Sequence, residues 1–297
     1  MQKQQGKVVA EQQIAEYISF LRENEKSENT IEKYRRDVTR FVQYCRGRPL
    51  DKNLTVEYKA SLKSAYKTTS INSMLVPVNS FLSFLDREDC RVRLLKCQKK
   101  IFCDERDELK KDEYLRMLRT AKAAKEEQLF LLLQTICGTG IRVSELKFVT
   151  VEAVNQGYAT VECKNKQRII LIPHKLQGML KSFATKQKIQ TGSIFLNAKG
   201  LPLTRFMVWR AMKRICKAAG VDQKKVFPHN LRHLFARTFY QQYHDLARLA
   251  DLLGHSSIET TRIYLIENAK SCYRTIAGLG LVTELGRMKF HPAELIT

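Results

Sequence analysis

Most of this 297-residue chain spaces its apolar residues as a helix does, and one short stretch does not. Residues three or four positions apart share one helical face, as Ile14, Tyr17, Ile18 and Leu21 do. The stretch YATVECKNKQRIILIP alternates apolar and polar residues, turns near Asn165 and then becomes apolar, which indicates a β-hairpin. The spacing therefore predicts a mainly α protein with a small β element.

A charge-dense segment separates two regions of helical spacing. It reads DREDCRVRLLKCQKKIFCDERDELKKDE and has few periodic apolar residues, as is typical of a linker. We therefore predict a four-helix domain over residues 1–92, a linker over 93–107, a second domain with the hairpin over 108–280, and an apolar tail over 281–297.

The helix boundaries of the first domain follow from capping residues and apolar spacing. Asn29 and Thr30 are predicted to cap its second helix. The third helix is expected over residues 55–64, and the fourth over 70–85 with a kink at Pro77.

The charge of the chain points to a polyanionic partner. Lys and Arg number 52 against 30 Asp and Glu, a net charge of +22. The excess is spread along the chain, which makes nucleic acid the first candidate and solubility alone the weaker explanation. A charged helical face is usually only solvated, but this excess favours phosphate contacts for the basic residues of the four helices. These residues are Lys33, Arg35, Arg36, Arg40, Lys63 and Lys67.

The sequence does not support secretion, a membrane-spanning segment, a zinc site or a disulfide framework. The N-terminal residues MQKQQGKVVA lack the apolar core of a secretory signal, and no apolar run is long enough to span a bilayer. The eight cysteines form no CxxC pair, which indicates reduced thiols rather than a zinc site or a disulfide framework. A cytoplasmic protein is expected.

Four short motifs in the second domain carry residues suited to phosphate chemistry. TGIRVSEL contains Arg142 and Glu145, and HNLRH places His229 and Arg232 on one face of a helix start. In LGH, Gly254 stops an amphipathic helix just before His255. Tyr264 follows nine residues later. Each residue alone is usually structural, so the set and its order carry the argument.

The order, spacing and context of these motifs, with Lys164 on the hairpin, resemble the tyrosine recombinase family of integrases and Xer recombinases. The resemblance covers residues 108–280, and the first domain looks like the SAM-like core-binding bundle of that family. It implies a mixed α/β catalytic domain that cleaves and rejoins DNA through a 3′-phosphotyrosyl intermediate. Because the covalent bond keeps the energy of the broken linkage, neither a metal nor another cofactor is implied.

The resemblance also implies a role for each catalytic residue. Tyr264 is the nucleophile, Arg142 and Arg232 grip the non-bridging phosphate oxygens, and His255 donates a hydrogen bond to the phosphate. His229 accepts the proton of Tyr264, Lys164 protonates the 5′ oxygen, and Glu145 orients an arginine or the base.

The hairpin departs from the family pattern GKGNKER. It reads ECKNKQR, one residue shorter between the first lysine and NKQR. Lys164 is the favoured acid because it follows the apolar strand directly, and Lys166 is the alternative. Lys166 and Arg168 are otherwise expected to contact the DNA backbone.

The resemblance implies double-stranded DNA and a homotetramer on two DNA sites as partners, with no membrane. It leaves a monomer open for the free chain. The tail over 281–297 is expected to contact a neighbouring protomer, or else to cap its own core. A catalytically idle DNA-binding regulator and a type IB topoisomerase-like enzyme are the alternatives.

Overall fold

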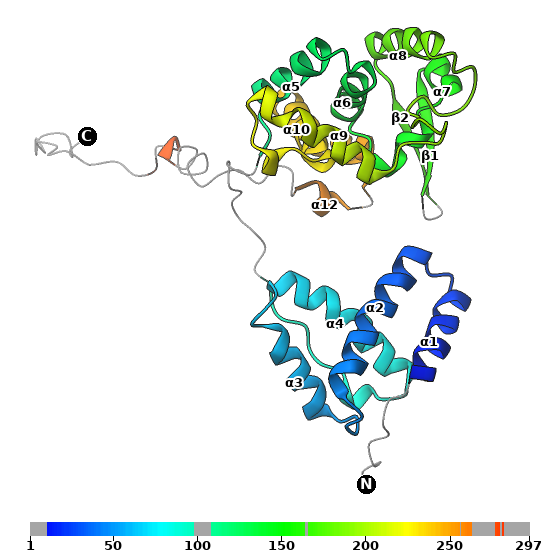
Figure 1. Ribbon diagram of the computed structural model, residues 1–297. Helices are drawn as coiled ribbons and strands as arrows, with labels where there is room; N and C mark the ends of the chain where they lie inside the picture. The colour runs from blue at the N-terminus through cyan, green and yellow to red at the C-terminus, as the bar shows by residue number, and fades with distance from the viewer. Residues whose placement is uncertain are drawn as a thin grey trace, which may run out of the picture. The chain divides into compact units, whose positions relative to one another are not determined.

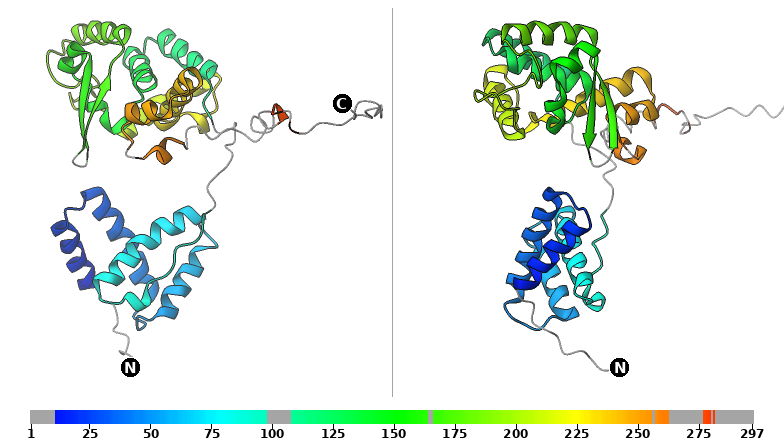
Figure 2. Two further views of the ribbon diagram at one scale, coloured as in Figure 1. Left: turned by 180° about the vertical axis from the view of Figure 1, so that it is seen from behind. Right: turned by 90° about the vertical axis from the view of Figure 1, so that its right-hand side faces the viewer.

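The computed structural model describes residues 11–97, 108–163, 166–255, 257–262, 277–279 and 281. The chain divides into two compact units, unit 1 over Met1–Lys99 and unit 2 over Lys100–Thr297 (Figure 1). Helices dominate both units, and one antiparallel hairpin lies at a side of unit 2 (Figure 2). The mainly α fold class with a small β element is confirmed.

The described part of unit 1 is built from four α-helices around an aromatic core. Helix α2 packs against both α1 and α4. Tyr17, Phe41 and Phe81 are fully buried, and the four apolar positions of α1 point inward as the spacing predicted. The helices are α1 (Glu11–Glu23), α2 (Glu28–Cys45), α3 (Lys52–Leu62) and α4 (Thr68–Phe84), and the short 3₁₀ helix η1 (Glu88–Cys90) follows.

Two of the predicted helix starts were wrong. Helix α2 begins at Glu28 with Ser27 as its N-cap, because the carbonyl of Ser27 already accepts the N–H groups of Thr30 and Ile31. Asn29 and Thr30 therefore lie inside the first turn. Helix α3 begins three residues before the expected Thr55, since Asp51 Oδ1 accepts the Leu54 N–H at 2.7 Å.

The segment after η1 runs along α4 in an extended conformation. The side-chain amide of Asn79 exchanges two hydrogen bonds with the backbone of Val92, at 2.8 and 2.9 Å. Asn72 does the same with Leu95, at 2.8 Å each. Each amide thus pairs with one peptide as a neighbouring strand would. Residues 93–97, the first part of the predicted linker, are therefore fixed to unit 1.

Unit 2 gathers its helices around α6. Leu129, Leu131, Leu132 and Ile136 are all buried, so α6 is apolar on several faces, as a central helix must be. Helices α5, α8 and α10 pack on it. Within the described ranges no helix is long and apolar enough to cross a membrane. The elements are α5 (Lys111–Ala123), α6 (Glu127–Thr139), η3 (Val143–Phe148), α7 (Val151–Gln156), β1 (Tyr158–Cys163), β2 (Lys166–Leu171), α8 (His174–Lys186), α9 (Arg205–Ala219), η4 (Gln223–Lys225), α10 (Pro228–Tyr243), α11 (Leu246–Leu253) and α12 (Ile258–Arg262).

The hairpin β1–β2 presents one face to the core. Its register pairs Tyr158 with Leu171 and Cys163 with Lys166. Val161 and Ile170 are buried, whereas Ile169 on the opposite face is 58% exposed. Because side chains alternate across a strand, Arg168 shares the inward face with Ile170.

The end of α6 requires a glycine. Gly140 caps the helix with φ of 64°, and a Cβ at this position would approach the Phe235 ring to 2.7 Å. We expect Gly140→Ala to lower the free energy of unfolding of unit 2 by about 1–3 kcal/mol. Urea unfolding followed by fluorescence of Trp209, the chain's one tryptophan, measures this in unit 2.

Gly138 provides the matched control, because it lies within α6 and has open space around its Cα. Gly138→Ala should be neutral or should stabilise the unit by up to about 1 kcal/mol, since alanine favours a helix. Equal effects of the two alanines would contradict the steric argument.

Candidate active site

The first catalytic candidate, Arg142, is placed by the end of α6. The turn at Gly140 redirects the chain, and Arg142 becomes the N-cap of η3, with its side chain 39% exposed. Glu145 accepts both the backbone N–H of Arg142 at 2.8 Å and its Nη1 at 2.9 Å. The carboxylate thus fixes the direction of a guanidinium that remains accessible to a ligand.

Glu145 is buried and ionised. Burial alone would raise the pKa of the Glu145 carboxyl, but hydrogen bonds from Arg168 and Arg142 lower it below its ordinary value. The side chain is 4% exposed, and its Oε2 also accepts a hydrogen bond from Arg168 Nη2. Glu145 therefore acts as an internal anion that holds two guanidiniums.

Helix α10 supplies His229 and Arg232. Pro228 occupies its first turn, so the helix begins there and both side chains lie three residues apart. Arg232 is 1% exposed and donates to the carbonyls of Gly140 and Leu253. These bonds bring the end of α6 and the end of α11 to one guanidinium.

His255 follows the Gly254 cap of α11 and binds Arg232 directly. Arg232 Nη2 lies 2.9 Å from His255 Nε2, and His255 Nδ1 lies 2.8 Å from Thr261 Oγ1 in α12. A guanidinium only donates, so Nε2 accepts and the ring proton is on Nδ1, which donates to Thr261. Partial burial and the charges of Arg232, Arg142 and Arg168 lower the pKa of His255 to about 4, so the ring is neutral at pH 7.

The electrostatics show that these groups share one positive site. Desolvation and the charges of Arg232, Arg142 and Arg205 lower the pKa of His229. Since Arg142 and Arg232 act on both His229 and His255, the four residues lie within electrostatic reach of one another. Three separate segments thus create a positive region suited to a phosphate.

Other predicted site residues are placed less completely. Tyr264 and Lys164 lie outside the described residues, as does nearly all of the tail over 281–297. Lys166 opens strand β2 opposite Cys163, and its side chain is also outside the described part. The choice between Lys164 and Lys166 as the acid stays a prediction.

Arg168 does not have the environment expected from the sequence. Its side chain is 12% exposed and is bound to Glu145 and to the carbonyl of Leu252. Its guanidinium therefore connects β2 to η3 and to the end of α11. These contacts are internal and leave the expected contact with the DNA backbone untested.

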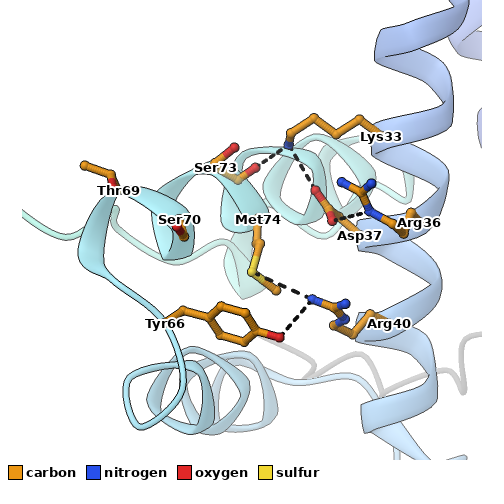
Figure 3. A pocket seen from close by; sticks show the side chains of 9 residues that line it. All are labelled: Lys33, Arg36, Asp37, Arg40, Tyr66, Thr69, Ser70, Ser73 and Met74. Carbon is orange, nitrogen blue, oxygen red and sulfur yellow. Dashed lines mark hydrogen bonds and ion pairs between the residues drawn. The ribbon is translucent and has the colours of Figure 1, made fainter. Parts of the chain in front are cut away.

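In unit 1, α2 and α4 border an open hollow of about 560 Å³ (Figure 3). Lys33 bridges the two helices, donating to Asp37 Oδ2 at 3.0 Å and to the Ser73 carbonyl at 2.6 Å. Arg36 and Arg40 are exposed beside it. The hollow is lined by Lys33, Arg36, Asp37, Arg40, Tyr66, Thr69, Ser70, Ser73 and Met74.

Three of the predicted DNA-binding residues do not line this hollow. Arg35 lies off the shared face of α2 and pairs with Glu32. Lys63 and Lys67 are exposed but are not among the lining residues. Conversely, no sequence pattern pointed to Tyr66, whose ring lies 5.9 Å from the Arg40 guanidinium, or to Thr261. Tyr66 meets a partner 26 residues away in the sequence, and Thr261 one that is six residues away.

Two family matches cover both units. Residues 107–271 match the Phage integrase family, and residues 14–89 match the N-terminal SAM-like domain of phage integrases. The tyrosine recombinase XerD of Staphylococcus haemolyticus (strain JCSC1435) is 30% identical over 277 residues, which cover 84% of this chain and 92% of XerD. The tyrosine recombinase XerA of Pyrococcus furiosus is 28% identical over 290 residues, with 94% and 98% covered.

Solved structures have the same fold. A lambda integrase dimer bound to a COC′ core site superposes with a TM-score of 0.71 at 20% identity, covering 87% of this chain and 77% of the integrase. The XerH recombinase bound to a palindromic difH substrate gives a TM-score of 0.70 at 20% identity, with 84% and 80% covered. With these similarities and the clustered Arg142, Arg232 and His255, this chain belongs to the phage integrase family and is a tyrosine-type site-specific recombinase.

Proposed function

We propose that Tyr264 cleaves one DNA strand at a phosphate held by Arg142, Arg232 and His255. The observation that carries this proposal is the convergence of these three side chains, on one positive region, from the end of α6, from α10 and from the turn after α11. The tyrosine oxygen attacks the phosphorus and the 5′ oxygen leaves, which yields a 3′-phosphotyrosyl bond. Reversal with a new 5′ hydroxyl rejoins the strand.

The two arginines neutralise the charge that develops on the non-bridging oxygens. Arg142 is partly exposed, and Arg232 is held rigidly by two backbone carbonyls, so both can donate with little reorganisation. A bound phosphate offsets the guanidinium charges and so raises the pKa of His255. His255 Nε2 can then carry a proton and donate it to a phosphate oxygen.

Proton transfer is assigned to His229 and the hairpin. The lowered pKa of His229 keeps its ring neutral near pH 7, so it can accept the proton of Tyr264. Lys164 protonates the leaving 5′ oxygen, and Lys166 is the alternative for this role.

The hollow of unit 1 is proposed as part of the DNA interface. Lys33, Arg36 and Arg40 supply positive charge along one face of α2, and the hydroxyls of Ser70 and Tyr66 lie beside them. Arg35, Lys63, Lys67 and Lys166 remain proposed phosphate contacts from their charge alone.

Binding should therefore depend strongly on salt. We expect the affinity for duplex DNA to fall by about 10³-fold or more between 50 and 200 mM salt, because many phosphates are contacted. Arg36→Gln should reduce the slope of log K against log salt by about 1. Fluorescence anisotropy with labelled duplexes measures both slopes.

Arg22→Gln is the control, because Arg22 is a 60% exposed arginine of α1 away from the hollow. Its slope should equal that of the unchanged chain. A weak salt response of the unchanged chain, or equal slopes for all three proteins, would contradict the proposed interface.

Four protomers on two DNA sites are proposed as the active assembly. A lambda integrase tetramer bound to a Holliday junction has this fold, with a TM-score of 0.68. We extend that arrangement to this chain and assign the tail over 281–297 to contacts between protomers. We also propose that the chain acts in the cytoplasm. The predicted domain and linker boundaries stay a prediction, except that residues 93–97 are bound to unit 1.

Covalent trapping tests the proposed function. Nicked duplexes from the DNA that flanks the chain's own gene are incubated with the protein without metal, and a denaturing gel should reveal a protein–DNA adduct. Tight binding without cleavage would instead support a catalytically idle regulator. Relaxation of supercoiled DNA without strand exchange between two sites would support a topoisomerase-like activity.

A further inference from the structure

Arg168 connects three segments that are distant in the sequence. From strand β2 its Nη1 donates to the Leu252 carbonyl at 3.0 Å, and its Nη2 forms an ion pair with Glu145 Oε2. Its aliphatic part lies against Gly254, where a Cβ would come within 2.2 Å of the Arg168 Cδ. Gly254 therefore permits the close passage of this side chain.

The first connection affects Arg142. Oε2 of Glu145 accepts from both Arg168 and the Arg142 backbone, while Oε1 accepts from the Arg142 guanidinium. Without Arg168, this buried carboxylate would lose one of its charged partners. Its orientation, and that of the Arg142 guanidinium, would then be less restricted.

The second connection affects His255. The last carbonyls of a helix have no partner within the helix, and cations there are favoured by the helix dipole. Arg168 binds the carbonyl of Leu252, and Arg232 binds the next one, that of Leu253. Two successive carbonyls at the end of α11 are thus fixed by two arginines, just before His255.

We propose that Arg168 is a positioning residue for strand cleavage, acting through Glu145 on Arg142 and through the end of α11 on His255, without contacting DNA itself. This inference rests on the proposed function. The planar fork of a guanidinium can serve both acceptors at once, whereas a single ammonium cannot hold both in the same geometry.

Cleavage assays distinguish a positioning role of Arg168 from a role in DNA binding. On a nicked duplex that the unchanged chain cleaves, Arg168→Gln should slow adduct formation on the order of 10- to 100-fold. Arg168→Lys should also be slower than the unchanged chain, and both variants should bind the duplex within about twofold of it, as expected for a side chain with internal partners and only 12% exposure. The control is Arg214→Gln, since Arg214 is a 63% exposed arginine paired with Glu126.

A substrate with a neutral scissile linkage distinguishes a loss of Arg142 and His255 positioning from a general disruption of the active site. A methylphosphonate carries no negative charge for Arg142 and His255 to neutralise, so the penalty of Arg168→Gln should shrink at least about tenfold on this substrate. Equal penalties on both substrates would overturn the proposal. So would normal cleavage by Arg168→Lys or Arg168→Gln, or a loss explained wholly by weaker binding.

A DNA-free measurement keeps the inference separate from the proposed function. In protein labelled with ¹⁵N-histidine, NMR above the pKa of His255 should show the proton on Nδ1 alone in the unchanged chain, because Arg232 donates to Nε2. Arg168→Gln should give a mixture of the two tautomers. An unchanged single tautomer would overturn the link to His255, whereas absence of any DNA adduct from the unchanged chain would count against the proposed function only.

Discussion

Tyr264→Phe should bind DNA as tightly as the unchanged chain and form no covalent adduct. The substitution removes one oxygen atom, the proposed nucleophile, and keeps the ring. Adduct formation should fall by more than about 10⁴-fold, because no other group then attacks the phosphorus. Covalent trapping on a denaturing gel, together with a binding assay on the same duplex, measures both effects.

Tyr243→Phe is the matched control. Tyr243 is an exposed tyrosine of α10, at 56%, and has no proposed role in cleavage. This variant should form the adduct at the normal rate. Persistent adduct from Tyr264→Phe would exclude Tyr264 as the nucleophile, and peptide mapping of the adduct would then locate the residue that replaces it.

The second large effect is expected for Arg142→Ala. Removal of one preorganised donor to the transition state should slow cleavage by about 10²–10³-fold, or roughly 3–4 kcal/mol of barrier. DNA binding should change little, because the lost interaction is strongest when charge develops on the phosphate. Single-turnover adduct formation at saturating protein measures the cleavage step.

The fold should tolerate Arg142→Ala. Glu145 keeps its ion pair with Arg168 and the backbone N–H of residue 142, so the buried carboxylate is not left without donors. Arg214→Ala, which removes an exposed arginine paired with Glu126, should cleave normally. A defect of Arg142→Ala that disappears at saturating protein would show a binding role and would contradict the role in the transition state.

The sequence predicted the helices and the hairpin because their signals are local. The buried positions of α1 and the end of α11 at Gly254 follow from apolar spacing and from the conformational freedom of glycine. The start of α2 was misplaced because Ser27, Asn29 and Thr30 all have capping side chains. Only the backbone hydrogen bonds decide which of such neighbours precedes the first turn.

The orientation of the Arg168 side chain could not be predicted from local sequence patterns. Strand alternation puts Arg168 and Ile170 on one face, but Ile169 on the other face is equally apolar. The sequence therefore could not decide which face is buried. Glu145 and the end of α11 decide it, since they provide acceptors for the guanidinium on the inner side.

By itself, the sequence determined the mainly α fold class and the order of the motifs, and its resemblance to a known family predicted roles for Arg142, Arg232, His229, His255 and Tyr264. The tertiary structure decided that Arg232 contacts His255 and fixes the tautomer of this histidine, that Thr261 is its second partner, and that Lys33, Arg36 and Arg40 share one hollow. Residue type and spacing express local preferences. Partners such as Gly140 and Arg232, 92 residues apart, meet only when burial of the core brings their segments together.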